Sequence, residues 1–182
     1  MANFKDCSKF ETHDDYYTTK DIWSNIAHLL PKDKILWEAC MLNASKSKSP
    51  DILRELGCSV FADPTMDMLT EKPPTGFDMI VTNIPFSNKI KKLVLQRLVD
   101  LDKPFLIIMN SMNMYTKYVR EIFKDKFHDL QVINPYGKLQ FEILKSDGTT
   151  FVNGNCSFYC IFLAYKMELK SEDLWLLTGK ND

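Results

Sequence analysis

FDMIVTNIPFSNK, residues 77–89, is the stretch of sequence that decides the fold. Its first half is a short apolar run with one early charge, which is typical of a strand buried in the middle of a parallel sheet. Residues 82–86 then end the strand, because Pro85 lacks a backbone donor and fixes its own φ. Asn83 carries an amide that both donates and accepts hydrogen bonds, and Phe86 presents a flat apolar ring. At the end of a buried strand, these residue types can hold a planar amine.

The chemistry that needs such a set is transfer to a poorly nucleophilic nitrogen conjugated to a ring or a carbonyl. An asparagine oxygen and a backbone carbonyl can accept its two N–H bonds, which draws the lone pair out of conjugation while an aromatic ring stacks on the plane. TNIPF resembles the (N/D/S)-P-P-(Y/F/W) motif of S-adenosylmethionine-dependent amino-methyltransferases, which act on adenine N6, cytosine N4 or protein glutamine. The resemblance implies that four residues hold the target amine: Asn83, Ile84, Pro85 and Phe86. Ile84 stands where the family has its first proline, and its backbone carbonyl remains.

Length and composition indicate one globular α/β domain. With 182 residues, 45% of them hydrophobic and 26% charged, the chain can build one substantial core. We expect a flexible tail over residues 1–11 and a single domain over residues 12–182. No apolar run approaches the ~20 residues that span a bilayer, and residues 1–15 show no targeting pattern, so we expect an intracellular protein without membrane contact. Five cysteines without a C-x-x-C pair predict neither a metal site nor a disulfide framework.

Strands alternate with helices along the chain, and this alternation predicts a doubly wound, Rossmann-like sheet. Apolar runs predict strands over residues 35–40, 58–62, 77–82, 104–109 and 130–133. Amphipathic spacing predicts one helix before Pro31, with Thr18 and Asp21 as a capping box, and others over residues 50–56, 88–101 and 116–127. Two extended segments, residues 138–144 and 156–165, complete the chain as an antiparallel pair. The sheet is therefore expected to be mostly parallel, with an antiparallel C-terminal strand.

The predicted helix over residues 88–101 has an apolar face and a charged face. The apolar face comprises Ile90, Leu93, Val94, Leu98 and Leu101. Lys89, Lys91 and Lys92 lie at the start of the helix. They could touch phosphates, but a charged helix face is usually only solvated, and that is what we expect here.

DDYYTTKDIW, residues 14–23, precedes the first predicted strand. An ordinary capped helix does not explain an aromatic pair beside two acids. The segment resembles the cofactor-binding segment, typically written Y-T-P, that lies N-terminal to the first strand in amino-methyltransferases. The resemblance implies that Tyr16, Tyr17 and Thr18 contact the methionine part of S-adenosylmethionine.

The first predicted strand ends in Trp37-Glu38-Ala39, and W-E matches the opening of the family's cofactor loop, W-E-P-F-x-G-x-G. The resemblance implies that Glu38 and Ala39 lie at the cofactor. The loop that follows, CMLNASKSKSPD, contains no glycine, although glycines would let the backbone approach a cofactor closely. Asn43 can adopt the left-handed conformation and so provide a substitute turn. The alternative is a fold that no longer binds the cofactor.

Two aspartates follow the second predicted strand. Asp63 comes directly after it, where doubly wound nucleotide-binding folds place an acid on a ribose hydroxyl. Asp67 takes the place where the family carries a second acid near the adenine ring, although either residue could be a simple loop acid. The segment TEKPPTG, residues 70–76, is too short for another helix and strand, so we expect one peripheral element of the complete family fold to be absent.

Glu38, Asp63 and Asn83 all end strands of the predicted sheet, so we expect them to meet at its switch point, where such folds bind ligands. From residue 14 to residue 167 the chain is similar to small adenine-type methyltransferases and methyltransferase-like proteins of large DNA viruses and phages. The leading hypothesis is S-adenosylmethionine-dependent methylation of an exocyclic amine, above all adenine N6 in DNA or RNA. Because there is no long insertion for target recognition, a protein partner could be required. The alternatives are a non-catalytic methyltransferase-fold scaffold and a protein glutamine methyltransferase.

Overall fold

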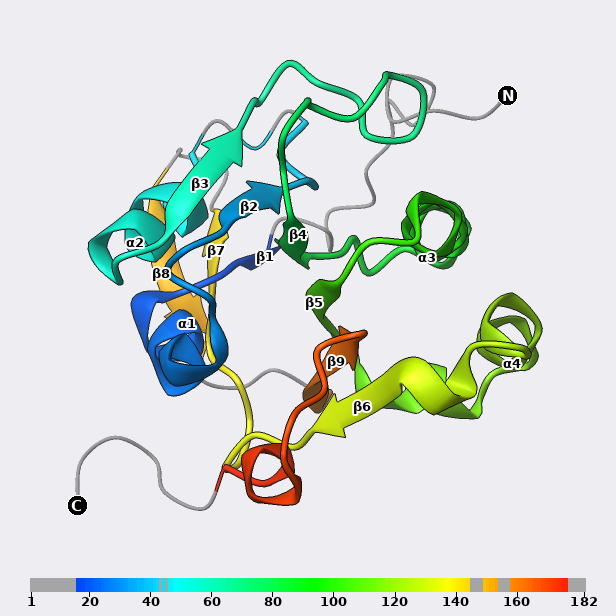
Figure 1. Ribbon diagram of the computed structural model, residues 1–182. Coiled ribbons are helices and arrows are strands. Elements are labelled where there is room, and N and C mark those ends of the chain that lie inside the picture. Colours follow the sequence, from blue (N-terminus) through cyan, green and yellow to red (C-terminus); the bar gives the residue numbers. More distant parts are fainter. Residues whose placement is uncertain (1–15, 43, 45, 145–148, 154–157, 177–182) are drawn as a thin grey trace.

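A six-stranded sheet runs through the middle of the molecule (Figure 1). The structure is a computed structural model that describes residues 16–42, 44, 46–144, 149–153 and 158–176. The expected N-terminal tail and Asn43 lie outside the described residues. In spatial order the strands are β3 (Ser59–Ala62), β2 (Ile35–Glu38), β4 (Met79–Asn83), β5 (Phe105–Asn110), β9 (Cys160–Tyr165) and β6 (Leu130–Ile133).

The pairing of these strands confirms the predicted sheet. β3, β2, β4 and β5 pair in parallel, whereas β9 lies antiparallel between β5 and β6. From β2 the chain moves outward to β3 and then returns to the other side of β2 as β4. The strand order therefore reverses between β2 and β4, and this is the switch point of a doubly wound fold. Among the described residues no strand lies beyond β3.

Helices cover both faces of the main sheet (Figure 1). On one face lie α1 (Lys20–Asn25) and α2 (Ser49–Glu55), and on the other lie α3 (Asn88–Leu101) and α4 (Lys117–Phe123). Pro50 occupies the first turn of α2, and Gly57 follows its end with a φ of 86°. None of the helices in the described part of the chain is long and apolar enough to cross a membrane.

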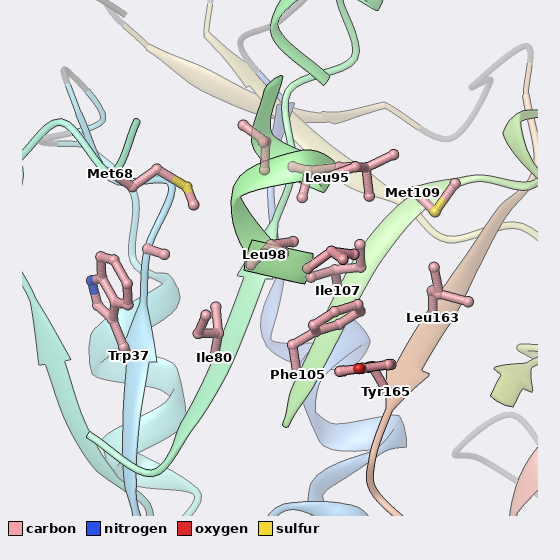
Figure 2. Packing of buried hydrophobic residues seen from close by; sticks show 14 of the residues in the cluster. Trp37, Met68, Ile80, Leu95, Leu98, Phe105, Ile107, Met109, Leu163 and Tyr165 are labelled. Carbon is pink, nitrogen blue, oxygen red and sulfur yellow. The ribbon is translucent and has the colours of Figure 1, made fainter. Parts of the chain in front are cut away.

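Alternating strand residues build two hydrophobic cores. Trp37, Ile80 and Ile107 point to the face covered by α3 and α4, whereas their neighbours Leu36 and Val81 point to the face covered by α1 and α2. Figure 2 shows the first core, with residues of α3 lying against the strand residues. Burial of both strand faces explains why these strands read as continuous apolar runs in the sequence.

A second, three-stranded antiparallel sheet lies on the α1 and α2 side, in the order β1 (Tyr16–Tyr17), β7 (Phe141–Leu144) and β8 (Thr150–Asn153). This corrects the expectation that residues 138–144 pair with the last strand. β7 pairs instead with β1 and β8, because Phe141 buries its ring completely in the core beneath α1 and α2.

Two local predictions were wrong. The first helix has Thr19 at its N-cap, without a side-chain capping bond, and the Thr19 hydroxyl donates instead to the Gln140 carbonyl at 3.0 Å. A tertiary contact thus replaces the predicted capping box. In α3, Leu93 is 36% exposed, while Leu95 and Val99 are buried beside the predicted core residues. The buried face of α3 is therefore rotated toward Leu95.

Candidate active site at the sheet switch point

The carboxyl ends of β2, β3 and β4 meet at one edge of the main sheet, which we call the carboxyl edge. Glu38 ends β2 opposite Ala62 of β3, and Asp63 follows immediately. β4 runs parallel to β2 on its other side and ends with Asn83. The structure thus places Glu38, Asp63 and Asn83 at the ends of three neighbouring strands, as the sequence predicted.

Asn83 joins the end of β4 to the N-terminal strand β1. Its side-chain Nδ2 donates a hydrogen bond to the Tyr16 carbonyl at 3.1 Å. Its Oδ1 is buried and has no hydrogen-bond donor among the described residues, and no other buried side-chain oxygen or nitrogen there lacks a partner. Because buried polar atoms are nearly always paired, this oxygen is the strongest indication of a ligand site in the described part of the chain.

Phe86 lies in a cluster of aromatic rings around the end of β4. Its ring centroid is 5.2 Å from that of Tyr16, 6.0 Å from that of Phe141 and 4.9 Å from that of Phe158. Between Asn83 and this ring, Ile84 and Pro85 are buried, and the Ile84 amide donates to the Ile108 carbonyl at 3.3 Å. The backbone of the motif is therefore joined to β5.

Glu38 is fully enclosed in a network of hydroxyl groups. Ser49 Oγ donates to one carboxylate oxygen at 2.5 Å, and Thr82 Oγ1 donates to the other. Trp23 Nε1 donates in turn to Ser49 Oγ at 2.8 Å. Burial raises the pKa of Glu38 to about 7, against the lowering effect of the two hydroxyl donors. In this arrangement Glu38 ties β2, β4 and α2 together next to Asn83.

The loop after β2 makes its turns without glycine. Ala39 is buried, and the Cys40 amide donates to Thr82 Oγ1 at 3.0 Å. The Ala44 amide bonds the Met41 carbonyl, and the Ser47 amide bonds the Ala44 carbonyl, each at 2.8 Å. Successive tight turns thus carry the chain from β2 into α2, and no described residue of this loop has a positive φ. The turn proposed for Asn43 lies outside the described residues.

The two aspartates after β3 differ in their surroundings. Asp63 is half-buried, and its carboxylate accepts hydrogen bonds from the Thr65 hydroxyl at 2.7 Å and the Thr65 amide at 2.8 Å, which lower the pKa of Asp63. Asp67 is completely buried, and its carboxylate accepts from the Leu69 amide at 2.9 Å. Asp63 thus presents an ionised group at the carboxyl edge, whereas Asp67 shapes the following turn.

The segment that contains Tyr16, Tyr17 and Thr18 lies beside Asn83. Tyr16 and Tyr17 form β1 and pair with β7 at Ile143 and Glu142, and Thr18 is buried. The structure therefore brings this segment to the candidate site from a distant part of the sequence.

Several residues of the site were not predicted. Thr82 and Ser49 hold Glu38, and the signal for Thr82 was a polar residue inside an otherwise apolar strand.

Lys91 is only 3% exposed and donates to Asn88 Oδ1 at 3.4 Å and Asn113 Oδ1 at 3.1 Å, so the expectation that it lies on a solvated helix face was wrong. It turns inward because these amide oxygens give its ammonium group acceptors between α3 and the end of β5.

No family model and no curated protein sequence matches the chain. The fold is nevertheless similar to solved structures. A candidate class I S-adenosylmethionine-dependent methyltransferase from Listeria monocytogenes has a TM-score of 0.55 at 12% identity, covering 96% of this chain and 71% of its own. An S-adenosylmethionine-dependent O-methyltransferase from Thermotoga maritima has a TM-score of 0.46 at 10% identity, with coverage of 93% and 74%. A tRNA methyltransferase from Aquifex aeolicus has a TM-score of 0.45 at 14% identity, with coverage of 90% and 74%.

The first of these similarities, over nearly the whole chain, shows the fold. The strand order, the switch point between β2 and β4 and the antiparallel β9 agree with it. The protein therefore has the Rossmann-like fold of class I S-adenosylmethionine-dependent methyltransferases.

Proposed function

We propose that the protein transfers a methyl group from S-adenosylmethionine to an exocyclic amine, with adenine N6 in a nucleic acid as the leading target. The observation that carries this proposal is the buried Asn83 Oδ1 without a donor. An amine conjugated to a ring supplies the N–H that this oxygen lacks. The fold and the aromatic cluster around Phe86 support the proposal.

The orientation of the Asn83 amide is fixed by its other hydrogen bond. Because Nδ2 donates to the Tyr16 carbonyl, Oδ1 must face away from that carbonyl as an acceptor. Asn83 Oδ1 accepts one N–H of the target amine, and the Ile84 or Pro85 backbone carbonyl accepts the other. Two such bonds draw the nitrogen lone pair out of conjugation, which makes it a better nucleophile. The rings around Phe86 exclude water from this point and offer a flat surface to the substrate.

The residues at the carboxyl edge fit the cofactor in part. S-adenosylmethionine supplies the electrophilic methyl group when it is bound. Asp63, ionised and half-buried after β3, is suited to accept hydrogen bonds from ribose hydroxyls. Ala39, with Tyr17 and Thr18 of the N-terminal segment, would lie along its methionine part. Asp67 contributes through the turn that it shapes rather than by direct contact.

One observation favours a second candidate, a non-catalytic protein that keeps the fold. Both carboxylate oxygens of Glu38 are occupied by Ser49 and Thr82, and the following loop has no glycine to bring its backbone close to a ligand. In this reading the switch point has become a structural core, and the protein acts by binding a partner.

Calorimetric titration with S-adenosylmethionine and with its demethylated product separates the two candidates. Methyl transfer predicts micromolar binding, worth about 8 kcal/mol. Asp63→Ala should weaken binding, whereas Asp51→Ala, which removes an exposed acid from α2, is the matched control and should not. Absence of binding up to millimolar cofactor would exclude methyl transfer by this chain alone. Binding followed by transfer of labelled methyl to adenine in an oligonucleotide would support the proposed substrate.

A further inference from the structure

The carboxyl edge continues from Asn83 across the ends of β5, β9 and β6. β9 begins where β5 ends, since Asn110 pairs with Cys160, and the Ser111 amide donates to the Tyr159 carbonyl at 2.8 Å. β6 runs parallel to β5 on the far side of β9, so the residues after Ile133 reach the same edge. The 3₁₀ turn Ser111–Tyr115, residues 134–138 and residues 158–159 are therefore neighbours along this edge.

Exposed aromatic and methionine side chains gather on these neighbouring segments. Tyr115 is 76% exposed and Tyr159 59%, and Met112 and Tyr136 are also mostly exposed. Tyr159 directly follows Phe158, whose ring packs on Phe86 at the candidate active site. The exposed rings thus begin one residue away from the proposed amine site. We call Met112, Tyr115, Tyr136, Tyr159, Lys89, Lys92 and Lys138 the tyrosine–lysine surface.

The charge along this half of the edge is positive although the whole chain has a net charge of −1. Residues 84–92, 111–120 and 134–141, which follow the ends of β4, β5 and β6, contain no aspartate or glutamate, and Lys89, Lys92 and Lys138 are exposed there. On the other side of the switch point, residues 62–78 contain four acids and one lysine. A polyanion approaching the carboxyl edge is therefore attracted to the β5 and β6 side and repelled from the β3 side.

Two lysines of the surface lie directly over tyrosine rings. Lys138 Nζ is 4.9 Å from the centroid of the Tyr159 ring, and Lys92 Nζ is 5.0 Å from that of Tyr118. The Tyr118 hydroxyl donates to Asn113 Oδ1 at 2.8 Å, which joins this second pair to the Ser111–Tyr115 turn. A positive charge beside an aromatic face is the combination that binds a phosphate and stacks the adjoining base.

We propose that the tyrosine–lysine surface binds a single-stranded polynucleotide and leads one of its bases to Asn83. The proposal rests on the proposed function for the identity of the reacting base. Exposed rings bind unstacked bases, which a duplex does not offer. The buried Asn83 Oδ1 can likewise reach an amine only on a base that has left its stack.

The test is fluorescence anisotropy with a short labelled adenine-only oligodeoxynucleotide, the full chain and no cofactor. Tyr159→Ala and Tyr115→Ala should each weaken binding roughly tenfold, as loss of one stacked base does. Phe127→Ala removes an exposed ring from the opposite edge, before β6, and should leave affinity unchanged. Lys138→Gln should weaken binding and reduce its dependence on salt.

Charge-only competitors complete the test. Inorganic polyphosphate should compete weakly, and its own affinity should not change in Tyr159→Ala. A duplex of the same sequence should bind more weakly than the single strand. The proposal would be overturned if polyphosphate, duplex and single strand bound equally well. It would also be overturned if Phe127→Ala weakened oligonucleotide binding as much as Tyr159→Ala, or if polyglutamate displaced the oligonucleotide at a similar concentration.

Failure of this proposal can be told apart from failure of the proposed function. Cofactor binding without oligonucleotide binding would overturn the tyrosine–lysine surface and leave methyl transfer standing. Oligonucleotide binding without cofactor binding would overturn methyl transfer and leave the surface standing.

Discussion

Asn83 and Tyr16, 67 residues apart in the sequence, are joined by a hydrogen bond from the Asn83 side-chain nitrogen to the Tyr16 carbonyl. This bond fixes the N-terminal strand β1 against the end of β4. It also decides which atom of the Asn83 amide can accept a further hydrogen bond. One contact therefore joins β1 to the proposed amine site and orients the Asn83 amide there.

Replacing Asn83 with alanine should remove methyl transfer while leaving cofactor affinity nearly intact, because the side chain is proposed to act on the amine and β1 stays paired with β7. Loss of one such preorganised group typically lowers the rate about a hundredfold or more. Single-turnover transfer and calorimetry measure the two effects separately. Asn25→Ala at the end of α1 is a matched control. If cofactor affinity fell as much as the rate, the role assigned to Asn83 would be wrong.

Replacing Tyr17 with alanine should weaken cofactor binding first, because this residue is proposed to lie along the methionine part. The rate at saturating cofactor should change little. Tyr16→Ala should instead lower the rate at saturating cofactor and leave cofactor affinity nearly unchanged. It keeps the backbone carbonyl that accepts from Asn83 but removes the ring next to Phe86. Equal calorimetric affinities for Tyr17→Ala and the unaltered protein would place this segment outside the cofactor site.

Glu38 should make the free energy of unfolding fall as pH rises between 4.5 and about 7. Burial raises the pKa of this carboxyl in the folded protein, so in that window the folded state keeps a proton that the unfolded chain releases. The total loss is about 3 kcal/mol. Below the window the group is protonated in both states, and above it the group is ionised in both, so its contribution is constant.

Urea denaturation across this window, with Glu38→Gln beside the unaltered protein, checks the pH effect. Glutamine keeps the shape of the side chain and cannot ionise, so the fall in the free energy of unfolding with rising pH should disappear in this variant. Asp102, whose pKa is lowered by Lys126, Lys166 and Tyr165, acts in the opposite sense and at lower pH, where its stabilisation is lost as it becomes protonated. An unchanged slope in Glu38→Gln would show that another group carries it.

Leu98→Ala should lower the free energy of unfolding by about 2–5 kcal/mol, because its side chain is completely buried between α3 and the main sheet. Leu93→Ala on the same helix should cost much less, because Leu93 is 36% exposed. The two variants have the same chemistry and differ only in the face they occupy. Similar urea midpoints for both would contradict the observed rotation of α3.

The order of strands and helices could be predicted from the sequence because both faces of the main sheet are buried. Residues 77–82 and 104–109 read as apolar runs for that reason, and β4 and β5 occupy nearly the same positions. The meeting of Glu38, Asp63 and Asn83 followed from parallel pairing alone. These are consequences of local pattern and of general rules of chain connection.

The rest depended on contacts between distant residues. Residues 138–144 have the composition of a strand in either sheet, and only the fit of Phe141 beneath α1 and α2 assigns them to the smaller one. The burial of Lys91 depends on Asn113, which lies beyond β5. Likewise, the sequence around Glu38 does not reveal that Thr82, from another strand, donates to its carboxylate.

The buried Asn83 Oδ1 has no donor among the described residues, so a ligand that brings one should stabilise the fold. A buried acceptor without a donor costs roughly 1–3 kcal/mol, which a ligand regains only if it brings an N–H to that atom. Adenine should therefore raise the melting temperature more than purine, which has the same ring without the amine. Thermal melting of the protein with a panel of bases would thus show which of them bring a donor to this atom.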